Sequence, residues 1–150
     1  MENKVSIMSR EVAEQMLSAF PSNTAVISFC DAPSRRTPAD YRPVDYSGVC
    51  DRVFTVPIHD IDIEILGEYG LTFDTYFPEA PDLARFILDA VDDGCDIICQ
   101  CEYGQSRSAA GAAAIREYFD HSGITVFADY RYYPNQLVFN KLLTALREAR

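Results

Sequence analysis

Positive charge is scarce in this chain. Of its 150 residues, 13 are lysine or arginine and 23 are aspartate or glutamate, so the formal net charge is −10. Proteins that bind nucleic acid or anionic membranes without specificity need a positive surface. The composition therefore argues against both kinds of partner, although amides and one arginine can still form an anion pocket inside an acidic protein.

The chain also lacks long apolar runs and a disulfide pattern. No stretch is long enough to span a bilayer, and residues 1–7 lack the apolar centre of a secretory signal. The five cysteines are an odd number without the spacing of a disulfide scaffold. We therefore expect a protein of the reducing cytoplasm.

What the chain does have is enough apolar sequence for a core, because 48 % of its residues are hydrophobic. Residues 1–150 should form one domain. Strands are predicted at residues 5–8, 24–30, 53–58 and 96–101, and helices at residues 9–20, 79–91, 106–121 and from 136 onward. Residues 31–48 are predicted to be an irregular segment, and residues 124–127 form a short apolar run. No helix or strand is predicted for residues 65–77. The alternation predicts an α/β three-layer sandwich, with a mainly parallel sheet flanked by helices and ligands bound beyond the strands' carboxyl ends.

Residues 101–108, Cys-Glu-Tyr-Gly-Gln-Ser-Arg-Ser, stand between an apolar strand and an alanine-rich helix. Loop amides and the helix N-terminus can converge on an anion and favour the thiolate of Cys101. The planar guanidinium of Arg107 can hold two phosphate oxygens. Gly104 permits a tight backbone turn.

This segment resembles the signature loop of the cysteine-based protein tyrosine phosphatases, in the small dual-specificity style. The resemblance implies that Cys101 is the nucleophile, Arg107 stabilises the phosphoryl group, and Ser108 helps the sulfur leave. It further implies no cofactor and no metal. The phosphate-binding segment would comprise Glu102, Tyr103, Gly104, Gln105, Ser106 and Arg107. The alternative is that Cys101 is a buried cysteine at a strand end and Arg107 a surface residue at a helix N-terminus.

A second stretch carries the same resemblance. Pro134 and Asn135 open the last predicted helix, as a Pro-Asn segment does in dual-specificity phosphatases, where the asparagine supports the catalytic loop. A helix cap alone is an equally compatible interpretation of Asn135.

The resemblance also implies a general acid, a carboxylic acid that protonates the leaving group. Three aspartates upstream of Cys101 are candidates for this role. Asp60 directly follows a predicted strand and is our first choice, with Asp62 second and Asp74 third. Asp60 and Asp62 lie farther from Cys101 in the sequence than the acid of this family usually does. If either is the acid, residues 64–73 are an insertion relative to the family. All three could instead be solvated loop acids.

Two positions depart from the family pattern. Gln100 stands where a histidine usually precedes the cysteine; because Gln100 cannot carry charge, we expect a less readily ionised thiol and slower turnover. Tyr103 stands where small residues are common, and would either line the rim of the pocket or pack on the aromatic turn at residues 129–134.

The sequence therefore predicts a phosphomonoester hydrolase that forms a phosphocysteine and acts on a phosphorylated protein or a small phosphomonoester. The alternative is a phosphate-binding or phosphoprotein-binding module of the same fold with weakened catalysis. A sulfur-transfer enzyme or arsenate reductase is a third class, against which the Arg107–Ser108 and Pro134–Asn135 pairs argue. Zinc at Cys95, Cys99 and Cys101 is disfavoured, because no second ligand pair stands at zinc-finger spacing.

Overall fold

Four parallel strands form the centre of the computed structural model, which describes residues 1–149. They are β1 (Val5–Ser9), β2 (Thr24–Cys30), β3 (Val53–Pro57) and β4 (Asp96–Cys101), in the order β1-β4-β2-β3. All four predicted strands are confirmed, those at 24–30 and 96–101 with unchanged bounds. Because every neighbouring pair is parallel, the carboxyl ends of the strands meet at one edge of the sheet.

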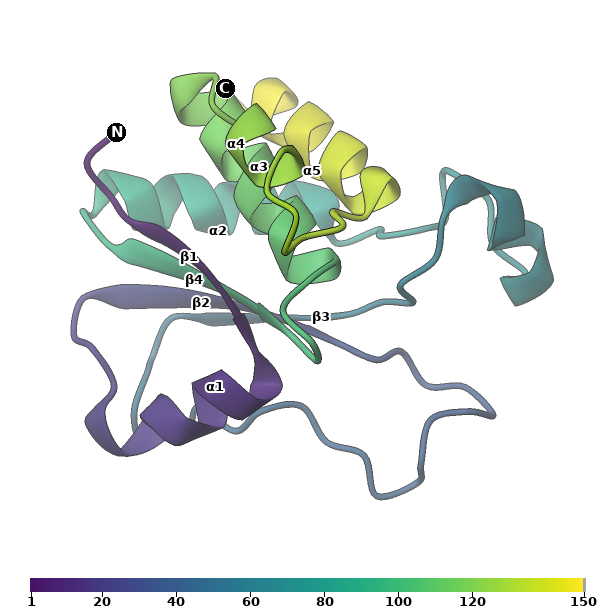
Figure 1. Cartoon of the computed structure of the whole chain (residues 1–150), viewed down its shortest axis with the longest axis horizontal. Helices are drawn as coiled ribbons and strands as arrows, with labels where there is room; N and C mark the ends of the chain where they lie inside the picture. The colour runs from purple at the N-terminus through teal and green to yellow at the C-terminus, as the bar shows by residue number, and fades with distance from the viewer. Residues whose placement is uncertain (150) are drawn as a thin grey trace.

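Helices cover both faces of this sheet, so the predicted three-layer sandwich is confirmed (Figure 1). One face carries α1 (Arg10–Met16) and the short 3₁₀ helix η1 (Leu17–Ala19). The other face carries α2 (Ala80–Asp92), α3 (Arg107–Asp120), α4 (Ile124–Phe127) and α5 (Gln136–Glu148). A further 3₁₀ helix, η2 (Ile63–Tyr69), overlaps the start of residues 65–77, for which no element was predicted.

The core lies on both sides of β2, whose seven residues are all buried. Ile27 and Phe29 point into the main cluster with α2, α3 and α5, whereas Val26 packs with Ala13 of α1. Alternate side chains of a strand point to opposite faces, so a strand covered on both faces needs apolar residues at nearly every position. This explains the uninterrupted apolar run of β2.

Two predicted helix starts are confirmed by their caps. Ser9 Oγ accepts a hydrogen bond of 3.2 Å from Val12 N, and Asn135 Oδ1 accepts one of 3.0 Å from Val138 N. The first helix ends earlier than predicted: α1 stops at Met16, and the chain tightens into η1 before Phe20 and Pro21. A 3₁₀ turn commonly ends an α-helix in this way.

In the described part of the chain, no helix is both long enough and apolar enough to span a membrane. The irregular segment at residues 31–48 follows β2, and η2 follows β3. Both therefore begin at the same edge of the sheet as the loop between β4 and α3, and they supply the surroundings of that loop.

Candidate active site

The loop between β4 and α3 wraps its backbone around the sulfur of Cys101. Gly104 N donates a hydrogen bond of 3.3 Å to Cys101 Sγ, and Ser108 Oγ lies 3.0 Å from the same sulfur. Cys101 is 2 % exposed. The sulfur thus lies at the base of the loop, with an amide and a hydroxyl as its polar neighbours, and a phosphoryl group must enter the loop to reach it.

Gly104 is required by the shape of the loop. Its φ is +69°, in the left-handed region that residues with a Cβ rarely adopt. A Cβ at this position would lie 2.6 Å from Ser9 N and 2.8 Å from the carbonyl carbon of Met8. The loop therefore packs directly against the junction of β1 and α1, which a larger residue would push away.

Arg107 begins α3 and is 4 % exposed. Its Nη1 donates a hydrogen bond of 3.0 Å to the carbonyl oxygen of Ile58, and its Nη2 lies 2.9 Å from Asp31 Oδ1. Burial alone would lower the pKa of Arg107, but the negative charges of Cys101, Asp31 and Asp60 outweigh it and raise the pKa. The guanidinium is therefore charged and fixed on one side by protein groups.

The third nitrogen of this guanidinium, Nε, has no partner in the described part of the chain. Arg107 Nε is buried and has no hydrogen-bond partner among residues 1–149. A buried donor without a partner costs roughly 1–3 kcal/mol, and more for a charged group. Nε and Nη2 together are the edge with which arginine binds two oxygens of an anion, so a bound phosphoryl group would satisfy the free donor.

The side chain of Gln100 supports the backbone at the start of the loop. Its Nε2 donates to the carbonyl oxygen of Cys101 at 3.1 Å, and its Oε1 accepts hydrogen bonds from Ser28 Oγ at 2.8 Å and Tyr46 Oη at 2.7 Å. Gln100 is buried, and its side chain lies in this small polar network. The glutamine therefore supports the loop backbone, although it brings no charge to the sulfur.

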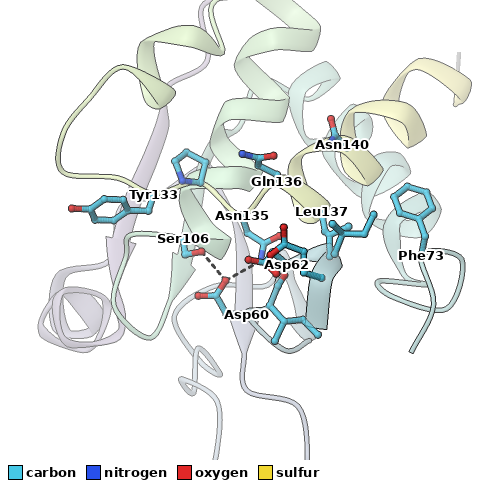
Figure 2. A pocket seen from close by; sticks show the side chains of 13 residues that line it. Asp60, Asp62, Phe73, Ser106, Tyr133, Asn135, Gln136, Leu137 and Asn140 are labelled. Carbon is cyan, nitrogen blue, oxygen red and sulfur yellow. Dashed lines mark hydrogen bonds between the residues drawn. The ribbon is translucent and has the colours of Figure 1, made fainter. Parts of the chain in front are cut away.

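Asp60 lies next to the start of α3. Its Oδ1 accepts hydrogen bonds from Ser106 Oγ at 2.7 Å and from Asn135 Nδ2 at 2.9 Å, as the dashed lines of Figure 2 show. Asn135 N also donates to the carbonyl oxygen of Ser106 at 3.2 Å. The same asparagine therefore caps α5 and hydrogen-bonds to both Asp60 and the backbone of Ser106.

The other two candidate acids lie elsewhere. Asp62 lines a cavity of about 620 Å³ that opens beside Asp60 and Ser106. Asp74 lines a different cavity, near Lys141, between the segment before α2 and α5. Of the three predicted acids, Asp60 is the one that hydrogen-bonds to a residue of the loop.

The remaining loop residues take different positions. Arg10 lies 3.3 Å from the carboxylate of Glu102, which also accepts a hydrogen bond from Tyr41, so Glu102 has only its backbone to offer a phosphate. Tyr103 is 82 % exposed, so its ring is not packed against the aromatic turn at residues 129–134. The carbonyl oxygen of Gln105 accepts a hydrogen bond from Tyr133 N at 2.8 Å.

Of the other cysteines, three are buried and Cys50 is partly buried. All five cysteines are free thiols, and burial raises the pKa of Cys99 to about 12. Within residues 1–149, no three histidine, cysteine, aspartate or glutamate side chains gather in a way that could hold a metal ion.

Comparison with known proteins identifies the fold. No protein-family model and no curated protein sequence matches the chain. A human tyrosine phosphatase-like serine/threonine/tyrosine-interacting protein superposes with a TM-score of 0.56 at 18 % identity, over 91 % of this chain and 83 % of that one. Tk-PTP in its active form gives 0.54 at 18 % identity, over 96 % and 90 % of the two chains. Human DUSP28 gives 0.53 at 18 % identity, over 96 % and 92 %. The chain therefore has the fold of the dual-specificity and protein tyrosine phosphatases.

Some residues of the site were not found from the sequence. Asp31, which pairs with Arg107, directly follows β2, and β2 is the neighbour of β4 in the sheet. The rule that ligand sites lie beyond adjacent carboxyl strand ends would have pointed to it. Ser28 and Tyr46, which hold Gln100, carry no such signal, because they resemble any polar residue near a strand.

Proposed function

We propose that the protein hydrolyses phosphomonoesters through a phosphocysteine at Cys101. The observation that carries the proposal is the buried guanidinium of Arg107, whose free Nε lies in a loop that also holds the thiol. A free donor on a buried cation needs an anion, and the loop supplies a nucleophile beside the place where that anion would bind.

In the first step the thiolate of Cys101 attacks phosphorus. A sulfur–phosphorus bond forms, and the bond between phosphorus and the leaving oxygen breaks. Loop amides and Arg107 stabilise the charge on the equatorial oxygens. Asp60 donates a proton to the leaving oxygen, so that the product departs as a neutral alcohol or phenol.

In the second step water attacks the phosphocysteine. Asp60, now a carboxylate, takes a proton from the water, and the sulfur–phosphorus bond breaks to release inorganic phosphate. Ser108 Oγ, 3.0 Å from the sulfur, donates a hydrogen bond to the departing thiolate. The enzyme returns to its starting state.

Asp60 is our choice of acid because of its contacts. Its Oδ1 is fixed by Ser106 and Asn135, while Oδ2 makes no hydrogen bond with any described residue and is free to carry the proton. Two fixed contacts hold the carboxyl group in one orientation beside the loop, as general acid catalysis requires.

The second candidate function is a module that binds phosphorylated ligands without turnover. Two observations favour it: the sulfur is almost fully buried, and one protein of this fold is described as a phosphatase-like interacting protein. It would use the same loop and Arg107.

Hydrolysis of p-nitrophenyl phosphate separates the two functions. An enzyme releases nitrophenol, and Cys101→Ser abolishes the release while leaving thermal unfolding unchanged. A module binds inorganic phosphate or phosphotyrosine, detected by calorimetry, with no release from the parent protein. Release that persists in Cys101→Ser would contradict the proposed nucleophile.

A further inference from the structure

A cavity of about 620 Å³ opens directly beside the catalytic loop. Asp60 and Ser106, which are joined by a hydrogen bond, form its boundary with the loop. Its other walls come from the segment that leads into η2 and from the start of α5 (Figure 2). A substrate whose phosphoryl group lies above Cys101 would pass over this opening.

The described lining of the cavity is negatively charged, and the cation next to it is Lys141, which contacts the ring and the carbonyl oxygen of Phe73. Asp62 and Glu64 line it, are exposed, and make no hydrogen bond or ion pair through their side chains within residues 1–149. No lysine or arginine is among its lining residues. Two other carboxylates near the loop differ, because Asp31 is paired with Arg107 and Glu102 with Arg10.

The rest of the lining suits an organic cation. Tyr133 and Phe73 line the cavity and are 71 % and 46 % exposed. Lys141 Nζ already lies over the Phe73 ring, 5.0 Å from its centroid, so the ring of Tyr133 is the aromatic face open to a further cation. Gln136 and Asn140 add side-chain amide oxygens from α5 (Figure 2). Carboxylates, amide oxygens and aromatic faces together are the groups that bind a guanidinium or ammonium group.

We infer that the substrate is a phosphorylated protein with an arginine or lysine close to the phosphorylated residue, and that this basic side chain binds in the cavity beside Asp60. The inference rests on the proposed function, because it places the phosphoryl group in the loop. Consecutive residues of an extended chain lie about 3.3–3.6 Å apart, so a long basic side chain one or two residues away can reach an adjoining cavity. An inositol phospholipid headgroup, which carries several phosphates, would be repelled by the same carboxylates.

The inference is tested with matched phosphotyrosyl peptides that differ in the residues flanking the phosphotyrosine: arginine, alanine or glutamate. We expect kcat/KM to be about tenfold higher for the arginine peptide than for the glutamate peptide at low salt, since the exposed carboxylates attract the arginine and repel the glutamate. The preference should shrink at high salt, because screening weakens exposed pairs. Equal rates for the three peptides would overturn the inference.

Variants assign the preference to the cavity. The double variant Asp62→Asn and Glu64→Gln should reduce the arginine preference to about twofold or less. Glu68→Gln removes one negative charge from an exposed position of η2 that does not line the cavity, and should keep the full preference. An unchanged preference in the double variant would show that the basic residue binds elsewhere.

Failure of the proposed function gives a different result. If no peptide releases phosphate, the affinities of fluorescent arginine and glutamate phosphopeptides for the parent protein and for Cys101→Ser still test the cavity. Tighter binding of the arginine peptide, lost in the double variant, supports the inference without catalysis; equal affinities overturn it. Faster hydrolysis of a soluble inositol phospholipid than of the arginine peptide would also overturn it.

Discussion

The loop between β4 and α3 and the segment that carries Asp60 lie side by side but are held very differently. In the loop, Cys101 and Arg107 are buried, and all their side-chain polar atoms except Arg107 Nε are bound by backbone groups, Ser108 or Asp31. In the other segment, Asp60, Asp62 and Glu64 are exposed, and Asp60 alone of these three is tied to the loop. One part of the site is fixed by the core and the other by a few surface contacts.

This difference separates chemistry from substrate choice. A buried loop with a defined backbone can stabilise charge at one point, which phosphoryl transfer requires. An exposed segment with unpaired carboxylates can change without disturbing the core, so it is suited to selecting what lies beside the phosphate. Asp60 lies at the boundary between the two parts, and the proposed mechanism gives it the role of general acid.

The largest effect is expected in the fixed part. Arg107→Lys should lower kcat/KM for p-nitrophenyl phosphate by about 10³-fold, because an ammonium group cannot contact Ile58, Asp31 and two phosphate oxygens at once. Steady-state kinetics measures the loss. Arg131→Lys, at an exposed position paired with Asp129, is the matched control and should behave like the parent. A loss below tenfold in Arg107→Lys would contradict the role of the guanidinium.

A smaller effect is expected at the boundary. Asp60→Asn keeps an oxygen that can accept from Ser106 but removes the proton, so turnover of an alkyl phosphate should fall by about 10²-fold. Aryl phosphates with good leaving groups should lose less, because they need less protonation. Asp74→Asn is the control and should lose nothing. A greater loss in Asp62→Asn than in Asp60→Asn would move the acid to Asp62.

The smallest effect concerns Gln100, which supports the backbone at the start of the loop. Gln100→His should speed alkylation of Cys101 by iodoacetamide at pH 6, because a charged imidazole favours the thiolate. It should also destabilise the fold by about 1–3 kcal/mol, since imidazole cannot accept from both Ser28 and Tyr46. Alkylation assays and chemical denaturation measure the two effects, with Gln15→His on the exposed face of α1 as control. Unchanged alkylation would contradict the expected influence of this position.

Much of the fold follows from local sequence. The apolar runs at 24–30 and 96–101 predict β2 and β4, because a strand that is buried on both faces needs apolar residues at nearly every position. Ser9 and Asn135 mark helix starts through their own side chains. By contrast, η2 could not be predicted, because its seven residues are too few for a helical period to show and Gly67 interrupts them.

The site divides in the same way. Cys101 ends β4, Gly104 lies in the loop and Arg107 begins α3, so one short stretch, together with the apolar strand before it and the helix after it, predicts that the three lie close together. Asp31 contacts Arg107 because β2 lies beside β4 in the sheet. The order of the strands cannot be predicted from the local sequence of either strand. The cavity beside Asp60 depends on how η2 and α5 face each other, which is a property of the tertiary structure.

The most direct test is mass spectrometry of protein quenched during turnover. With Asp60→Asn and p-nitrophenyl phosphate, hydrolysis of the intermediate should be slow enough for a phosphoryl group to accumulate on the peptide that contains Cys101. The combination with Cys101→Ser should carry none. Turnover by the parent with no phosphoryl group ever found on Cys101, or with the group found on another residue, would contradict the account.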